Sequence, residues 1–137
     1  MIKQTRLYQM IRKMYYKRLL IKQLKWCNSI TDVDYVIRKK VNFPHPIGIT
    51  ISKRAVIGDN CNIYQNVTLG SRKGGYPTLK DNVTILGHSI IVGDVTIGEN
   101  SIIGIGSMVM KDVPANVIWA GQPARFIRQV NENDNIY

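Results

Sequence analysis

The stretch VTILGHSIIVGDVTIGENSIIGIGSMV, residues 83–109, carries a large aliphatic side chain at every sixth position. The same period runs through most of the chain, in the series Ile51, Ile57, Ile63, Leu69 and then Leu79, Ile85, Ile91, Ile97, Ile103, Val109. An α-helix needs apolar residues about every 3.6 positions and a flat strand every 2. A period of six requires the chain to turn a corner once per repeat, which predicts a parallel β-helix whose repeats bury their aliphatics by stacking.

A second series supports the same geometry. Small or β-branched residues stand two positions before most of the aliphatics: Ala55, Cys61, Val67, Val83, Ser89, Val95, Ser101 and Ser107. Three hexapeptides are expected to close one triangular coil of about eighteen residues, and successive coils to stack at about 4.8 Å. We expect the aliphatics to point inward from the faces and the small residues to fill the corners.

The period breaks once, because Leu79 follows Leu69 by ten positions instead of six. The interruption, Gly70-Ser71-Arg72-Lys73-Gly74-Gly75-Tyr76-Pro77-Thr78, is rich in turn-forming residues and carries two cations. A tolerated surface loop is one interpretation. Insertions in solenoids tend to gather on the binding face, so we predict a functional loop over residues 70–78.

Charge is concentrated in the first forty residues, which hold eleven of the nineteen Lys and Arg but only Asp32 and Asp34 among the acids. We therefore predict a basic helical segment over 1–40, the β-helix domain over 41–116 and a C-terminal extension over 117–137. Two cysteines indicate no disulfide framework. No transmembrane run or signal peptide is recognised, so a cytoplasmic location is expected.

The basic segment has the pattern of an amphipathic helix. Leu7, Met10, Ile11, Met14 and Tyr15 recur at spacings of three and four, opposite a cationic face. Three roles are open: packing on the solenoid or on a second copy, peripheral contact with an anionic membrane through residues 1–25, or nucleic-acid binding. No nucleic-acid-reading motif accompanies the basic patch, so nucleic acid is not expected as a partner.

Candidate catalytic groups are few. His45 and His88 are the only histidines, which excludes a metal site built from three imidazoles, and no CxxC pair or carboxylate cluster suggests another metal. Cys61 falls in an inward corner position and is interpreted as an inert packed thiol. A single histidine acting as general base is the chemistry that remains.

Two segments resemble a known family. Phe43-Pro44-His45-Pro46-Ile47-Gly48-Ile49-Thr50-Ile51, with Gln65-Asn66-Val67-Thr68-Leu69-Gly70, is similar to the catalytic region of serine O-acetyltransferases. The tail Met110-Lys111-Asp112-Val113-Pro114, with Ala120-Gly121-Gln122-Pro123-Ala124-Arg125, resembles the coenzyme A end of the galactoside and maltose acetyltransferases. All are hexapeptide-repeat acyltransferases, so the resemblance, which covers roughly residues 36 to 128, implies an all-β fold, the left-handed parallel β-helix.

The resemblance also implies roles for single residues. His45 matches the base that deprotonates an acceptor hydroxyl as it attacks the thioester of acetyl-CoA. A backbone N–H of Gly70 or Ser71, two residues expected beside the cofactor, is a candidate for stabilising the oxyanion. The family further implies a homotrimer with active sites between neighbouring subunits.

Five more residues are expected to bind the donor. Lys111, Arg125 and Arg128 match basic positions that meet the nucleotide and phosphate portion of coenzyme A. Gly87 and Ile105 fall where small residues of the relatives border the pantetheine arm, and Ile105 is bulkier than the usual residue there.

Departures from the serine enzymes favour a different acceptor. Pro44 and Ile30 stand where those enzymes carry Asp, and Tyr76 replaces a second His. We therefore expect a sugar hydroxyl of surface-polysaccharide biosynthesis as acceptor, Tyr76 as a substrate-binding residue, and action at the inner face of the membrane. Serine O-acetylation is the enzymatic alternative, and a non-catalytic, membrane-binding β-helix scaffold is the alternative of another class.

Overall fold

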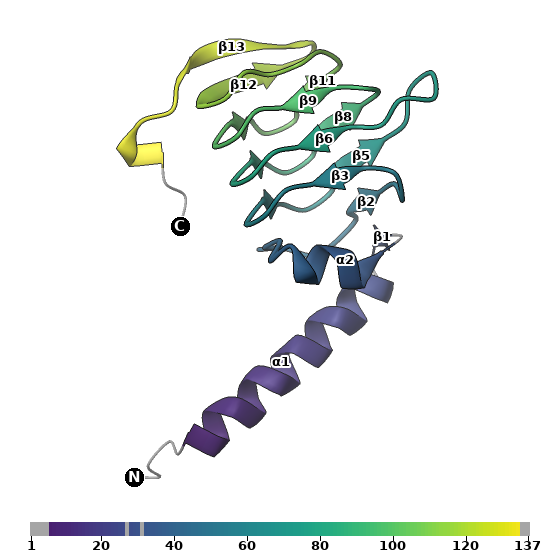
Figure 1. Cartoon of the computed structure of the whole chain (residues 1–137), viewed down its shortest axis with the longest axis vertical. Helices are drawn as coiled ribbons and strands as arrows, with labels where there is room; N and C mark the ends of the chain where they lie inside the picture. Colours follow the sequence, from purple (N-terminus) through teal and green to yellow (C-terminus); the bar gives the residue numbers. More distant parts are fainter. Residues whose placement is uncertain (1–5, 27, 31, 135–137) are drawn as a thin grey trace.

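The computed structural model describes residues 6–26, 28–30 and 32–134. The ends of the predicted segments 1–40 and 117–137, and also Cys27, lie outside the described residues. Figure 1 shows a stack of triangular coils with a long helix leaving its base and a two-stranded hairpin at its top.

The first twelve strands pair with one another in parallel and build three sheets, one on each face of the prism. Sheet A contains β1 (Ser29–Ile30), β2 (Thr50–Ile51), β5 (Thr68–Gly70), β8 (Ile90–Val92) and β11 (Met108–Val109). Sheet B contains β4 (Asn62–Ile63), β7 (Thr84–Ile85), β10 (Ile102–Ile103), β12 (Val117–Gly121) and the antiparallel β13 (Ala124–Gln129). Sheet C contains β3 (Val56–Ile57), β6 (Thr78–Leu79) and β9 (Thr96–Ile97).

The strand register confirms the predicted coil. Ile85 pairs with Ile103, a separation of three hexapeptides. The separation between the paired residues Ile63 and Ile85 is four residues longer, because the 70–78 insertion lies in that coil. The interruption is thus extruded as a loop between β5 and β6, and the pairing above and below it is unchanged (Figure 1).

The core consists of the two residue series that the sequence indicated. Every aliphatic of the six-residue series is at most 4% exposed, and every small corner residue from Ala55 to Ser107 is also buried. The corner serines stay satisfied, because Ser101 Oγ donates to Pro114 O at 2.6 Å and Ser107 Oγ to Gly104 O at 2.6 Å. Burial raises the pKa of the Cys61 thiol to about 11, which fits an inert packed cysteine.

Short elements close both ends of the solenoid. At the base, α2 (Val33–Arg38) begins at the N-cap Asp32 and buries Val33 and Val36. The hydroxyl of Tyr35 donates to Ile57 O at 2.9 Å and accepts from Ile57 N at 3.0 Å, which fixes α2 to the first coil. At the top, the β12–β13 hairpin extends sheet B and is followed by the 3₁₀ turn η1 (Glu132–Asp134).

The long helix α1 (Arg6–Trp26) contains no Gly or Pro, and its Leu, Met, Lys, Arg and Gln residues have high helix propensity. Only its C-terminal part packs: Leu24 is fully buried, and Leu20 and Ile21 contact the core. Residues 9–19 are exposed as the helix extends away from the solenoid (Figure 1). No helix in the described part of the chain has both the length and the apolarity needed to cross a bilayer.

Candidate active site

The chain turns from one sheet to the next at three edges of the prism, and the predicted site residues lie mainly on two of them. The histidine edge, between sheets B and A, consists of residues 43–48, 64–66, 86–88 and 104–106. The basic edge, between sheets A and C, consists of residues 52–55, 70–77, 92–95 and 110–112. The asparagine edge, between sheets C and B, consists of residues 58–61, 80–83, 98–101 and 114–116.

His45 lies on a tight turn at the lower end of the histidine edge. Phe43 and Ile49, both buried, anchor the chain on either side of it. The N–H of Ile47 donates to the carbonyl of His45 at 2.8 Å, which closes a three-residue turn around Pro46. The imidazole is exposed and lies edge-on to the Tyr64 ring, with 6.1 Å between centroids. Within the described residues it forms no hydrogen bond or ion pair, so no carboxylate of that part of the chain orients it.

Asn28, which sequence reasoning missed, holds this turn in place. Its Nδ2 donates to Pro46 O at 2.9 Å and to Gln23 O at 3.1 Å, and its Oδ1 accepts from Ile49 N at 2.7 Å. One side chain therefore ties the end of α1 to both flanks of the His45 turn. The six-residue period gives no signal for Asn28, because it lies outside the repeats.

Gly87 and Ile105 stack above His45 on the histidine edge, where the turns are joined by hydrogen bonds such as Gly106 N to Gly87 O at 2.9 Å. Ile105 is 69% exposed. Gly87 is buried against the amide of Gln65, and a Cβ on Gly87 would lie 3.0 Å from that amide. Gln65 Oε1 is buried without a hydrogen-bond partner in the described part of the chain, which makes Gln65 a further site candidate that the sequence did not single out.

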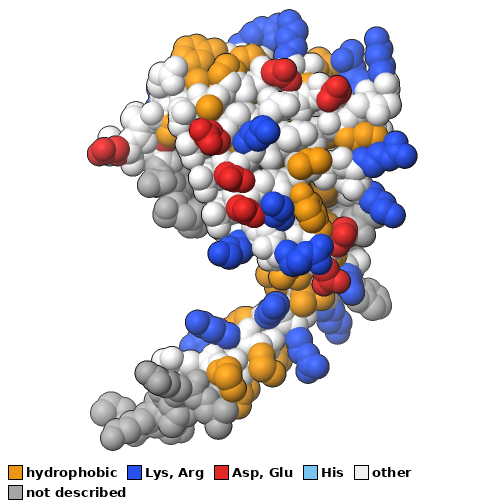
Figure 2. Space-filling view, in the orientation of Figure 1, with side chains coloured by type: hydrophobic (Ala, Val, Ile, Leu, Met, Phe, Trp, Pro, Cys, Tyr) orange, Lys and Arg blue, Asp and Glu red, His pale blue; other side chains and the backbone are white. Residues whose placement is uncertain are grey.

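The basic edge gathers most of the cations of the solenoid. Of the eight Lys and Arg in residues 41–137, six lie on this edge or at its upper end: Lys53, Arg54, Arg72, Lys73, Lys111 and Arg125. Asp94 and Asp112 are the only acids on the same edge. In Figure 2, Lys and Arg side chains gather on the side of the solenoid that carries the 70–78 loop.

Two adjoining hollows, of about 450 and 240 Å³, follow the basic edge and share Arg72 and Met110. The upper one brings Arg72, Lys111 and Arg125 together beside methionines and Pro123, so it combines positive charge with apolar surface. This is the composition that a phosphate-bearing thioester with an apolar arm requires.

Three predicted site residues, Gly70, Ser71 and Tyr76, belong to the 70–78 loop on the same edge. Gly70 ends β5, and Ser71 is exposed at the beginning of the loop. Tyr76 is half-buried, and the guanidinium of Arg54 lies over its ring at 5.6 Å from the centroid, a cation–π contact. Arg54 thus places a cation beside the predicted substrate-binding residue.

Arg128 is not part of this groove. It forms a bidentate ion pair with Asp134, with both N–O distances at 2.6 Å. This pair lowers the pKa of the Asp134 carboxyl to about 2. The structure therefore brings Lys111 and Arg125 together, whereas Arg128 is engaged by the C-terminal turn.

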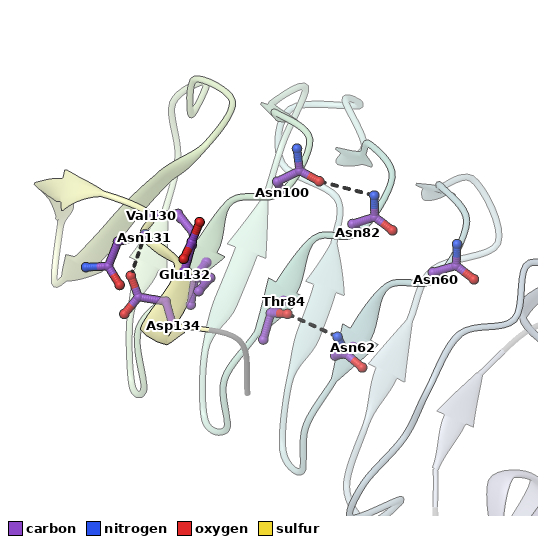
Figure 3. Close-up of a pocket in the computed structure, with 10 residues that line it drawn as sticks. Asn60, Asn62, Asn82, Thr84, Asn100, Val130, Asn131, Glu132 and Asp134 are labelled. Carbon is purple, nitrogen blue, oxygen red and sulfur yellow. Dashed lines mark hydrogen bonds between the residues drawn. The ribbon is translucent and has the colours of Figure 1, made fainter. Parts of the chain in front are cut away.

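The asparagine edge carries a hollow of about 570 Å³ against the C-terminal turn (Figure 3). Its amides bond to one another or to neighbouring side chains: Asn82 Nδ2 donates to Asn100 Oδ1 and Asn62 Nδ2 to Thr84 Oγ1, both at 3.1 Å. The asparagines at the corners adopt positive φ, a conformation that Asn tolerates better than most residues. We interpret these hydrogen-bonded asparagines as residues that stabilise the turns.

No family model matches the chain. Individual relatives do. It is 33% identical over 132 residues to the serine acetyltransferase of Bacillus pumilus (strain SAFR-032), a match that covers 90% of this chain and 60% of the relative. It is 46% identical over 95 residues to the galactoside O-acetyltransferase of Escherichia coli (strain K12), with 59% and 47% covered.

A solved serine acetyltransferase in complex with CoA has the same fold, with a TM-score of 0.61 and 33% identity over 64% of this chain and 37% of that one. This chain has the fold and the repeat pattern of the hexapeptide-repeat acyltransferases. The expected left-handed parallel β-helix is confirmed. The chain spans about half the length of the curated acyltransferases that it matches.

Proposed function

We propose that this acyltransferase moves the acetyl group of acetyl-CoA to a hydroxyl, with His45 as the general base. The observation that carries the proposal is the pairing of one exposed imidazole, on a pinned turn, with a cationic and apolar groove on the next edge. The similarity to acetyltransferases, one of them solved with CoA, supports the choice of donor.

The reaction needs one base and one set of anion-stabilising donors. His45 takes the proton of the acceptor hydroxyl while that oxygen attacks the thioester carbonyl. The carbon–sulfur bond then breaks, and the thiolate of CoA leaves and takes up a proton. The negative charge on the carbonyl oxygen is assigned to backbone N–H groups at the start of the 70–78 loop, at Gly70 or Ser71.

Charge suggests the direction of the donor. Lys111, Arg125 and Arg72 lie at the upper end of the basic edge, and His45 lies at the base of the prism. The two levels differ by three coil steps from β2 to β11, roughly 14 Å at the usual strand spacing. We therefore orient the donor along the solenoid axis, with its phosphates at the top and its thioester toward the base.

The separation of the two edges suggests an assembly. Sheet A lies between the histidine edge and the basic edge of one chain. A homotrimer in which the histidine edge of one copy meets the basic edge of the next would unite the two half-sites, with residues 41–116 as the catalytic unit. Such a neighbour would also offer the missing group that orients His45.

Serine and a sugar hydroxyl are the two acceptors to distinguish. Serine is favoured by the serine acetyltransferases, one of which matches 90% of this chain. A sugar hydroxyl is favoured by the galactoside acetyltransferase and by Tyr76, whose aromatic ring in the loop provides a surface suited to a sugar ring. Because surface glycans offer such hydroxyls, polysaccharide biosynthesis stays part of this second proposal.

The test is thiol release from acetyl-CoA with serine, galactosides and acidic oligosaccharides offered in parallel. We expect turnover with at least one acceptor and its loss in His45→Ala, while His88→Ala retains activity. Absence of CoA binding and of acetyl-CoA consumption with every acceptor would favour a non-catalytic scaffold.

A further inference from the structure

Helix α1 has two ridges whose chemistry changes halfway along its length. Residues spaced three or four apart share a face of a helix. The packed ridge follows Lys13, Lys17, Leu20 and Leu24, and its last two residues contact the solenoid. The free ridge follows Ile11, Met14, Arg18, Lys22 and Lys25, all exposed. Each ridge is apolar where the other is cationic.

The apolar end of the free ridge belongs to a broader patch. Met10, Ile11, Met14 and Tyr15 are between 53% and 64% exposed. Figure 2 shows the projecting helix carrying hydrophobic side chains with Lys and Arg around them. The patch lies on the part of the helix that extends away from the solenoid, so burial of Leu24 does nothing to cover it.

Charge decides which occupant fits this surface. Residues 6–26 hold seven Lys and Arg and no Asp or Glu. A second copy of the helix would bring cation against cation with no carboxylate to pair, so the helix opposes its own copy. Nucleic acid would neutralise the cations but offers no partner for four exposed apolar side chains. A bilayer with anionic lipids suits both the cations and the apolar side chains of α1, because phosphate lies next to hydrocarbon at its surface.

We propose that α1 binds the surface of an anionic bilayer through its free ridge. Ile11 and Met14, with Met10 and Tyr15 beside them, enter the boundary between headgroups and acyl chains, and Arg18, Lys22 and Lys25 contact lipid phosphates. The His45 turn lies at the same end of the solenoid and is tied to Gln23 of α1 through Asn28. Membrane binding therefore sets the base of the solenoid, with the His45 turn, next to the lipid surface.

The experiment is co-sedimentation of the full chain with phosphatidylcholine vesicles, with and without about 30% phosphatidylglycerol. We expect binding only to the anionic vesicles, weakened when salt is raised because the cations are screened. Arg18→Gln with Lys22→Gln should lower the partition coefficient roughly 25-fold, at about fivefold per cation. Ile11→Ser with Met14→Ser should lower it at least tenfold without a change in charge.

The matched control is Lys13→Gln with Lys17→Gln, which removes the same charge from the packed ridge and should cost distinctly less than the free-ridge pair. All six positions are exposed, so the fold is retained, as circular dichroism checks. Equal losses from the two charge pairs, no binding by the parent chain, or full binding by the Ile11/Met14 variant would each overturn the proposal. A change in oligomeric mass in that variant, with vesicle binding unchanged, would identify a second copy as the occupant instead.

Discussion

The histidine edge and the basic edge are made by the same repeat but differ in chemistry. On the histidine edge, residues 43–48, 64–66, 86–88 and 104–106 include two histidines and no Lys, Arg, Asp or Glu. The basic edge carries five cations, with Arg125 beside its upper end. The inward residues of both edges are equivalent, so the repeat determines the frame and the outward turn residues determine the chemistry. Each edge holds half of the proposed site.

The largest expected effect is on the histidine edge. His45→Ala should reduce kcat by roughly 10²–10⁴-fold, the usual contribution of a general base. CoA affinity should stay near that of the parent, because His45 lies away from the cationic groove. Steady-state kinetics and calorimetric CoA titration measure the two quantities. A variant that keeps turnover within threefold of the parent removes His45 from the mechanism.

The complementary change on the basic edge should act on donor binding. Lys111→Gln with Arg125→Gln should raise the KM for acetyl-CoA about tenfold or more per residue, since each charge-assisted hydrogen bond contributes about 1.5–3 kcal/mol. Arg128→Gln is the matched control, because Arg128 is engaged by Asp134 outside the groove. If the Arg128 variant shows the larger rise in KM, the phosphates bind elsewhere.

A smaller effect is expected from the side chain that positions the histidine turn. Asn28→Ala removes the contacts to Pro46 and Ile49 and should lower the free energy of unfolding by about 1–2 kcal/mol, at about 1 kcal/mol per hydrogen bond. We expect kcat to fall several-fold with little change in the KM for acetyl-CoA. Asn28→Asp keeps the acceptor for Ile49 N–H, so its stability and kcat should lie between those of the parent and of Asn28→Ala. An equal loss of kcat and donor affinity would indicate a general structural role.

The smallest effect concerns the ion pair between Arg128 and Asp134, which lies outside the groove. Because Arg128 lowers the pKa of Asp134 to about 2, the stabilisation from this pair is present above the ordinary pKa of Asp and is lost as pH falls through about 2. In Arg128→Gln, the carboxyl pKa measured by NMR should rise toward the ordinary range. An unchanged pKa would show that the pair does not form in solution.

The sequence predicted the interior better than the ends. Ile57, Leu79 and Ile97 stack as their spacing indicates, because an inward side chain in a solenoid meets only its repeats above and below. The His45 turn and the Lys111 groove were predicted through family likeness. Asn28 could not be predicted, because its three backbone partners are brought together by the join between α1 and the first coil. The ion pair of Arg128 could not be predicted either, because it depends on where the C-terminal turn places Asp134.

The exposure of the apolar residues of α1 also could not be predicted from the spacing of its residues. An amphipathic pattern over Met10 to Tyr15 is visible in the sequence, but the residues of α1 that pack, Leu20, Ile21 and Leu24, lie further along the helix. The solenoid covers only the C-terminal part of α1, so the apolar side chains nearer its N-terminus stay exposed. Only the packed structure shows where this cover ends.

Mixing two inactive variants tests most directly whether the edges of neighbouring copies form one site. His45→Ala, and Lys111→Glu with Arg125→Glu, should each be inactive at low acetyl-CoA. If they are unfolded and refolded together in equal amounts, random assembly gives about one quarter of the interfaces both an intact histidine edge and an intact basic edge. We predict recovery of about one quarter of the parent activity. No recovery, from mixed oligomers verified by mass, would show that the two edges do not combine across subunits.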